Sequence, residues 1–352
     1  MTQWMDILHQ AVENQASDVF FVAGKAPCQK LEGRILPLGE ERLLPPDTET
    51  IVREIYERAQ RSMEIFLETG DDDFSFAVPG LARFRVNTYR QRGSMAAVIR
   101  LVSFDIPDWQ SIHIPEAVME LAGTESGLIL VTGTAGSGKT TTQACIIDRI
   151  NRTRECHIVT LEDPIEYLHR HRRSIVNQRE VAIDTKDYLT ALRSTVRQAP
   201  DVILLGEMRD AQTMHTAMSA AETGHLVLAT LHTKGAVNAI DRIIDAFPST
   251  QQAQVRVQLA TVLKTVVSQQ LLPDREGGMI PACEIMHMSS AIRSMIRDNK
   301  NHQIDNAIAA SGAEGMISMD QAILKLYREE KITKETALLY ADRPEQMKRN
   351  MS

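Results

Sequence analysis

One glycine-rich segment, residues 133–140, has residue types and spacing that could bind a nucleotide. It reads Gly-Thr-Ala-Gly-Ser-Gly-Lys-Thr, which fits the pattern of glycine, any four residues, glycine, lysine and then serine or threonine. Glycines let backbone N–H groups approach phosphate oxygens closely, and a following helix adds the positive end of its dipole. Lys139 would then bridge the β- and γ-phosphates, while Thr140 would ligate Mg²⁺. The alternative is a simple glycine-rich turn.

The residues around this segment predict the elements that must position it. An apolar run at 128–131 precedes the segment, and an amphipathic stretch at 141–150 follows it. Strand, loop and helix in this order are typical of a phosphate-binding loop. Further apolar runs alternate with helical stretches, which predicts a parallel sheet covered by helices. These further runs are 158–161, 202–205 and 226–231.

Acidic residues follow two of the predicted strands. Residues 161–166 read Leu-Glu-Asp-Pro-Ile-Glu, and residues 206–210 read Gly-Glu-Met-Arg-Asp. Ligands of open parallel sheets bind at the carboxyl ends of the strands, so both groups are expected on the edge that carries the phosphate loop. Each carboxylate alone would be a surface charge. Their shared placement instead favours a role with the metal and the attacking water.

Four histidines lie near the predicted strands and are candidate site residues. His225 and His232 bracket the apolar run at 226–231. Position favours His232 as a polar contact near the nucleotide, because it follows the strand, whereas His225 precedes it. His169 and His171 lie in a basic run without metal-ligand spacing, so we expect them on a solvated basic face.

The first hundred residues predict a small α+β domain. A helix is expected around 4–11, short strands on either side of a turn at 31–35, a helix over 48–60, and strands over 83–89 and 95–102. Asp71, Asp72 and Asp73 are expected in a solvated turn. A proline-containing stretch then predicts a linker, and the tail from Ser289 predicts helices alone. The expected division is 1–104 for the N-terminal domain, 105–115 for the linker and 116–352 for the ATPase domain.

Composition excludes several classes of protein. Hydrophobic residues make up 43% and charged residues 24%, as in ordinary globular proteins, and the formal net charge of −7 argues against a general polyanion-binding surface. No apolar run is long enough for a membrane span, and the N-terminus lacks a signal peptide pattern, so we expect a cytoplasmic protein. Four widely separated cysteines are expected as buried apolar side chains rather than as disulfides or a zinc site. They are Cys28, Cys145, Cys156 and Cys283.

Together these motifs resemble those of the type IV pilus retraction ATPases, which belong to the secretion ATPase superfamily. The glycine-rich segment resembles their Walker A motif, and Leu-Glu-Asp-Pro-Ile-Glu resembles their Asp box. Residues 204–210 resemble their Walker B motif, and residues 222–233 resemble their His box. The resemblance implies an α/β protein with an N-terminal α+β, PAS-like domain. It also implies a C-terminal RecA-like P-loop ATPase domain with a helical C-terminal region.

The resemblance also implies roles for individual residues. Glu166 would orient or activate the attacking water, and Glu207 would support Mg²⁺ together with Thr140. His225 and His232 would complete the catalytic group. ATP and Mg²⁺ are the expected cofactors. The residues expected to bind the nucleotide are Gly133, Thr134, Ala135, Gly136, Ser137, Gly138, Lys139, Thr140 and Thr141.

Two further features of the family bear on assembly and on the direction of pilus movement. Family members form hexameric rings in which arginines of the N-terminal domain approach the nucleotide of a neighbouring subunit. Arg83, Arg85 and Arg100 fall in the matching stretch, and the sequence does not select among them. Residues 291–298, Ala-Ile-Arg-Ser-Met-Ile-Arg-Asp, resemble the retraction motif of these ATPases. An ordinary amphipathic helix is the alternative. The motif residues are Ala291, Ile292, Arg293, Met295, Ile296 and Arg297.

The resemblance therefore implies a homo-hexameric motor that hydrolyses ATP to ADP and phosphate. It would power pilus retraction, pilus disassembly and twitching motility from the inner face of the cytoplasmic membrane. An inner-membrane pilus platform protein is the expected partner, and a paralogous retraction ATPase is a further candidate; no transmembrane segment is expected.

Two other functions remain as alternatives. A RecA-like nucleic-acid translocase is disfavoured by 5% aromatic residues and the negative net charge, so no nucleic-acid partner is expected. A non-hydrolysing, nucleotide-binding regulator of a related pilus motor is disfavoured because all the expected catalytic residues are present.

Overall fold

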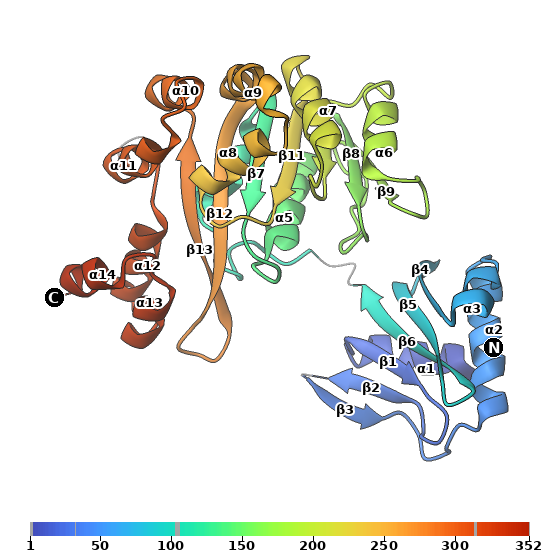
Figure 1. Cartoon of the computed structure of the whole chain (residues 1–352). Coiled ribbons are helices and arrows are strands. Elements are labelled where there is room, and N and C mark those ends of the chain that lie inside the picture. Colours follow the sequence, from blue (N-terminus) through green and yellow to red (C-terminus); the bar gives the residue numbers. More distant parts are fainter. Residues whose placement is uncertain (1–2, 32, 103–105, 313–314, 352) are drawn as a thin grey trace. The chain divides into compact units, whose positions relative to one another are not determined.

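The computed structural model describes residues 3–31, 33–102, 106–312 and 315–351. The chain divides into two compact units (Figure 1). The first comprises Met1–Asp105 with Glu166–Leu168, and the second comprises Ile106–Ile165 with His169–Ser352. Each unit contains one sheet of its own. The α/β fold with a PAS-like N-terminal unit and a RecA-like unit, as expected from the sequence, is confirmed.

The first unit is built on a six-stranded antiparallel sheet in the order β3-β2-β1-β6-β5-β4. One face packs against α1 (Gln3–Glu13), α2 (Pro45–Arg58) and α3 (Glu64–Thr69), with Leu8, Ile55 and Phe66 fully buried in the shared core. Alternating burial along the strands leaves the other face polar. The strands are β1 (Asp18–Phe21), β2 (Cys28–Leu31), β3 (Arg34–Pro37), β4 (Asp71–Val78), β5 (Ala82–Gln91) and β6 (Ser94–Val102).

Two predictions for this unit need correction. The acidic run is not a solvated turn, because it forms the start of β4 and its alternation points Asp72 into the core. The Asp72 carboxylate accepts a hydrogen bond of 2.9 Å from the Tyr56 hydroxyl and two of 2.8 Å from the Arg61 guanidinium. The predicted helix 48–60 begins earlier, at Pro45, because prolines are accepted in a first turn that needs no N–H donor.

The second unit has a seven-stranded sheet in the order β13-β12-β7-β11-β10-β8-β9. All neighbouring pairs are parallel except β12 and β13. The four apolar runs predicted as strands are confirmed as β7, β8, β10 and β11. The strands are β7 (Gly127–Thr132), β8 (His157–Glu162), β9 (Ile175–Glu180), β10 (Val202–Leu205), β11 (Leu226–Leu231), β12 (Leu263–Pro273) and β13 (Met279–His287).

Helices cover both faces of this sheet (Figure 1). One face packs against α6 (Tyr188–Thr195), α7 (Ala211–Glu222), α8 (Ala236–Asp245) and α9 (Ser249–Val262). The other packs against α4 (Glu116–Met119) and α5 (Lys139–Thr153). The predicted linker begins at Asp105, which lies outside the described residues, but Ile106 and Ile114 pack into this second core.

The tail is helical, as predicted, apart from an isolated bridge between Ile317 and Ile285 of β13. Its last three helices pack against the β12–β13 hairpin. The tail contains α10 (Ser290–Arg297), α11 (Ile304–Ala310), α12 (Met319–Arg328), α13 (Lys334–Tyr340) and α14 (Pro344–Asn350), with a short 3₁₀ turn at Asn301–Gln303.

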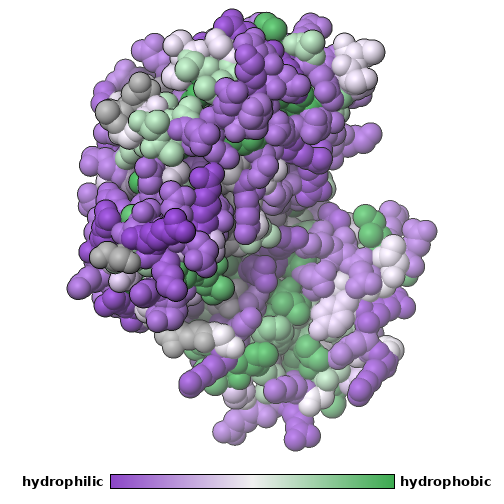
Figure 2. Space-filling model, turned by 60° about the vertical axis from the view of Figure 1, so that its left-hand side comes forward, coloured by the Kyte–Doolittle hydropathy of each residue, from purple (hydrophilic) through white to green (hydrophobic). Residues whose placement is uncertain are grey.

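Features of surface and burial bear on the expectations from composition. Among the described residues, none of the helices is long and apolar enough to cross a membrane. The face seen in Figure 2 is mainly hydrophilic, with apolar side chains in scattered groups. All four cysteines are free thiols; Cys28, Cys145 and Cys283 are buried and Cys156 is half-buried.

Candidate nucleotide site

The glycine-rich loop joins β7 to α5, and its glycines adopt backbone angles that favour glycine. The φ angles of Gly133, Gly136 and Gly138 are +147°, +76° and +83°. A Cβ atom on Gly133 would lie 2.3 Å from the backbone oxygen of Gln269. By contrast, a Cβ atom on Gly136 would meet no heavy atom within 4 Å. The loop is therefore closely packed at its start and open at its middle.

Lys139 is the first residue of α5, and its ammonium group lies within the loop. It donates hydrogen bonds of 2.8 Å to the carbonyl oxygens of Gly133 and Thr134. The hydroxyl of Ser137 is buried without a hydrogen-bond partner among the described residues. An ammonium, a helix N-terminus and an unused hydroxyl around one loop match what a nucleotide phosphate requires.

Gln269 of β12, the strand next to β7, packs against this loop. It is not among the residues predicted from the sequence. Its side-chain oxygen accepts a hydrogen bond of 2.8 Å from the Thr142 hydroxyl. Its side-chain nitrogen lies 2.8 Å from where a Cβ atom of Gly138 would stand. Gln269 is only 2% exposed. A polar residue inside an apolar strand was the available signal, but its partner is distant in sequence.

The sheet register brings the two acidic motifs to the edge that carries the loop. Leu231 of β11 is opposite Thr132 of β7, and Leu205 of β10 is opposite Leu161 of β8. The β7, β8, β10 and β11 strands therefore end together, as the sequence predicted. Glu162 is the last residue of β8, and its carboxylate accepts hydrogen bonds from the Thr160 hydroxyl at 2.6 Å and the Gln178 amide at 3.1 Å.

Glu207 and His232 meet at this edge although they follow different strands. The Nε2 atom of His232 lies 3.4 Å from a carboxylate oxygen of Glu207. The other carboxylate oxygen of Glu207 forms an ion pair with Arg209. Glu207 is largely buried, whereas the His232 and Arg209 side chains are exposed. The edge therefore holds a fixed carboxylate that faces two accessible nitrogen-bearing groups.

Tyr188 and Gly206 lie beside these carboxylates. A Cβ atom on Gly206 would lie 2.7 Å from the Tyr188 hydroxyl, so glycine is needed where the phenol packs. Burial, reinforced by the nearby charges of Asp163 and Glu207, raises the pKa of Tyr188 above its ordinary value. The phenol is therefore a neutral neighbour of the acidic groups. The sequence alone gave no signal for this contact.

The structure places one of the predicted catalytic histidines away from this edge and does not test the role of Glu166. His225 precedes β11, and its Nδ1 atom lies 2.9 Å from the carbonyl oxygen of Ala220. A six-residue strand is about 20 Å long, so His225 and His232 lie at opposite ends of β11. Glu166 is exposed and belongs to the segment Glu166–Leu168 that groups with the first unit. The catalytic roles of both residues stay predictions.

The three candidate arginines share the polar face of the first unit's sheet. Arg85 is opposite Arg100 in the β5–β6 register. Arg85 donates hydrogen bonds of 3.1 and 2.6 Å to the Asp73 carboxylate, and Arg100 donates one of 3.0 Å to Asp18. Arg83 donates one of 2.7 Å to the Ser75 hydroxyl. All three are held by neighbours in their own unit, so these contacts do not select one of them.

The prediction of a solvated basic face is wrong for His169. Its Nδ1 atom is buried without a partner among the described residues, and burial lowers the pKa of the ring to about 4. His171 is exposed, as predicted, and its Nδ1 atom accepts a hydrogen bond of 3.0 Å from the Val176 amide. The described part of the chain contains no group of three or more histidine, cysteine, aspartate or glutamate residues that could hold a metal ion.

The predicted retraction motif forms α10, and its apolar stripe faces inward. Ile292 and Ile296 are fully buried, and Met295 packs against the same core. Ala291 is exposed, so the buried stripe is narrower than predicted. Arg293 is half-buried and Arg297 is exposed.

Comparisons with known proteins cover nearly the whole chain. The family model described as Type II/IV secretion system protein matches residues 2–350. The type IV pilus retractation ATPase PilT of Pseudomonas aeruginosa is 40% identical over 341 residues, covering 97% of this chain and 98% of that protein. The type IV pilus ATPase PilU of the same organism is 39% identical, covering 96% and 88%. A crystal structure of the pilus retraction motor PilT with bound ADP superposes with a TM-score of 0.90 at 44% identity, covering 99% and 100%.

Proposed function

This chain belongs to the Type II/IV secretion system protein family, and we propose that it is an ATP-hydrolysing motor that powers type IV pilus retraction. The observation that carries the proposal is the meeting of the glycine-rich loop, Glu207 and His232 at one sheet edge. The full-length similarity to a retraction motor with bound ADP supports it.

The loop and the sheet edge supply the groups that phosphoryl transfer needs. Residues 133–141 would surround the phosphates, and Lys139 would exchange its two loop carbonyls for phosphate oxygens. Thr140 and Glu207 would hold Mg²⁺, which when bound neutralises phosphate charge. Glu166 would orient the water and accept its proton. His232 would hold the Glu207 carboxylate in place through the contact described above.

A homo-hexamer would complete the site with an arginine from a neighbouring subunit. Arg83, Arg85 and Arg100 are the candidates, and their ion pairs and hydrogen bonds would have to loosen for one of them to reach a phosphate. The Arg100 side chain is 66% exposed and that of Arg85 is 38% exposed, so of these two Arg100 would give up less. We infer a ring at the inner face of the cytoplasmic membrane that acts on a pilus platform protein, with a paralogous ATPase as a second partner.

A deletion strain of the source bacterium tests the pilus role directly. We expect it to keep surface pili and to lose retraction and twitching, and the unaltered gene to restore both. The Lys139→Ala variant should not restore them, although it should be present at the same level. A deletion strain with normal retraction would contradict the proposed function.

A further inference from the structure

A buried carboxylate joins the beginnings of two helices that are far apart in sequence. Glu284 of β13 is 6% exposed. One carboxylate oxygen accepts a hydrogen bond of 2.8 Å from the amide of Ala236, the first residue of α8. The other accepts one of 3.3 Å from the amide of Met319, the first residue of α12. A single side chain therefore caps both helices.

Ser268 completes this arrangement at α8. It is the cross-strand neighbour of Glu284 in the β12–β13 hairpin, and its hydroxyl accepts a hydrogen bond of 2.8 Å from the Gly235 amide. The residue before α8 is a glycine, so the helix has no side-chain cap of its own. First-turn amides of a helix need such partners. The hairpin supplies two of them, to the consecutive residues Gly235 and Ala236.

The start of α8 lies next to the candidate nucleotide site along the chain. Residues 232–235 form the short connection from β11 to α8, and His232 is the first of them. The residue after Ser268 is Gln269, whose side chain points to the opposite face of the sheet and accepts a hydrogen bond from Thr142 of α5. Gln269 also lies against Gly133 and Gly138 of the glycine-rich loop. The same hairpin thus contacts both the phosphate loop and the connection that carries His232.

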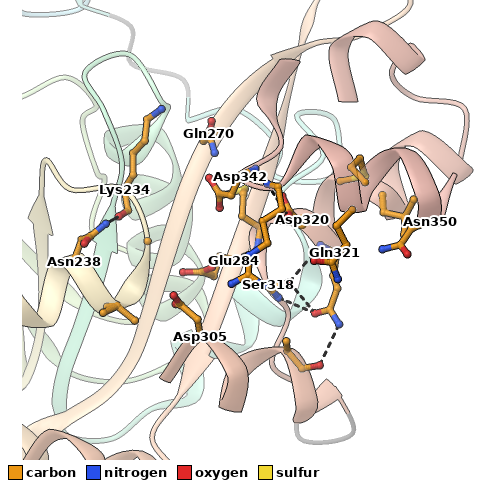
Figure 3. A pocket seen from close by; sticks show the side chains of 18 residues that line it. Lys234, Asn238, Gln270, Glu284, Asp305, Ser318, Asp320, Gln321, Asp342 and Asn350 are labelled. Atoms are coloured by element: carbon orange, nitrogen blue, oxygen red, sulfur yellow. Dashed lines mark hydrogen bonds between the residues drawn. The ribbon is translucent and has the colours of Figure 1, made fainter. Parts of the chain in front are cut away.

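Glu284 also borders a cavity of about 560 Å³ between α8, the hairpin and the C-terminal helices (Figure 3). Asp305, Asp320 and Asp342 line it together with Lys234. Burial raises the pKa of Glu284, while its two backbone hydrogen bonds act in the opposite direction. Asp320 accepts hydrogen bonds of 2.8 and 3.1 Å from the amides that precede α14. The helices beyond Glu284 are therefore joined to one another as well as to the hairpin.

We propose that Glu284 is a positioning residue for the ATPase site. Together with Ser268 it fixes the start of α8, and thereby the connection that carries His232. Through its hydrogen bond with Met319 it also links the start of α8 to α12. The role rests on the proposed function. Glu284 acts through His232 and the Glu207 carboxylate rather than by touching the nucleotide. Turnover should therefore depend on Glu284 more than nucleotide binding does.

The Glu284→Gln variant tests this, because glutamine keeps one neutral oxygen, which can serve only one of the two N–H groups at a time, while its NH₂ group faces the other; both caps are therefore weakened. We expect kcat for ATP to fall roughly tenfold, the effect of losing one or two buried hydrogen bonds. We expect Kd for ADP to change less than about threefold on the same scale. Hydrogen exchange should become faster at the amides of Ala236 and Met319.

Two matched serine variants separate positioning from loss of stability. Ser268→Ala releases only the α8 side, so it should lower kcat and speed exchange at Gly235. Ser318→Ala removes the side-chain cap of α12, where the hydroxyl accepts a hydrogen bond of 3.4 Å from the Gln321 amide. It should speed exchange in α12 and leave kcat within about twofold of the unaltered chain, because α8 keeps both caps.

Three outcomes would overturn the proposal. One is an unchanged kcat for Glu284→Gln, and another is an equal loss of kcat for Ser318→Ala. The third is unchanged exchange at Ala236 in Glu284→Gln, which would show that the carboxylate does not fix α8. An unaltered chain without ATP turnover would instead contradict the proposed function, and the exchange at Ala236 would still test the positioning role.

Discussion

The carboxyl edge of the second unit's sheet and the polar face of the first unit's sheet both gather charged side chains, but they hold them differently. At the edge, Glu162 and Glu207 are largely buried at the ends of buried parallel strands, next to a loop fixed by its backbone. On the polar face, Arg85 and Arg100 stand on strands with exposed guanidinium groups. Arg85 pairs with the exposed Asp73, and Arg100 pairs with the largely buried Asp18. The charged side chains at the edge are positioned by the topology of the sheet, and those on the polar face are positioned by pairing with other side chains.

Because of this difference, substitutions should have unequal effects in the two regions. Buried, preorganised groups cannot be replaced by water without loss, whereas exposed ion pairs contribute little to stability. We therefore expect large effects at the edge and small effects on stability at the polar face.

The largest effect is expected for Glu166→Gln, which tests whether Glu166 acts in catalysis together with Glu207 and His232. Hydrolysis should slow by about 10²-fold or more, the usual result of losing a general base, because glutamine cannot accept the water's proton. ADP binding measured by calorimetry should be unchanged. Turnover equal to that of the unaltered chain would remove Glu166 from this role.

Lys139→Ala should weaken nucleotide binding by about 10- to 100-fold, because a buried ammonium makes charge-assisted hydrogen bonds to phosphate. Titration with ADP measures the change. Lys186→Ala, which removes an exposed lysine of the same unit, is the control and should bind normally. Equal affinities for the two variants would place the phosphate site elsewhere.

Gly133→Ala and Gly136→Ala compare the packed and open parts of the loop. Both place alanine at positive φ, but a Cβ atom meets backbone only at Gly133. We expect unfolding free energy to fall by about 1 kcal/mol for Gly136→Ala and by about 2–4 kcal/mol for Gly133→Ala. Urea denaturation checks this, and equal costs would mean that Gln269 does not restrict the loop.

The smallest effect is expected on the polar face. Arg85→Ala and Arg100→Ala should each change the unfolding free energy by less than about 1 kcal/mol, because both arginine side chains are exposed and Asp18 keeps its hydrogen bond from the Ser17 hydroxyl. Denaturation of the first unit measures this. A loss of several kcal/mol would show that these arginines hold the sheet together and would end the contrast between the two regions.

Much of the edge could be predicted from the sequence because buried parallel strands appear as continuous apolar runs. The runs that became β7, β8, β10 and β11 place their following residues together by topology alone. The same argument predicts His232 as a polar contact near the nucleotide, on the edge where the acidic motifs are also expected. It also ranked His225 lower, and His225 lies at the other end of β11.

The remaining features depend on contacts between residues distant in sequence. Gln269, Glu284 and Tyr188 gave no motif, because each acts through a partner that the fold alone brings near. The predictions that Asp72 and His169 are solvated are wrong for a related reason. A local charge run indicates solvent exposure, but Asp72 follows the alternation of β4, and the Nδ1 atom of His169 is buried although His171 in the same run is exposed.

ATP turnover by the purified, unaltered chain, measured with and without Mg²⁺ and with and without DNA, shows whether this protein is an ATP-driven motor that works without nucleic acid. We expect turnover that requires Mg²⁺, is lost in Lys139→Ala and does not respond to DNA. Turnover that appears only with DNA, or tight nucleotide binding with no turnover in Mg²⁺, would contradict this expectation.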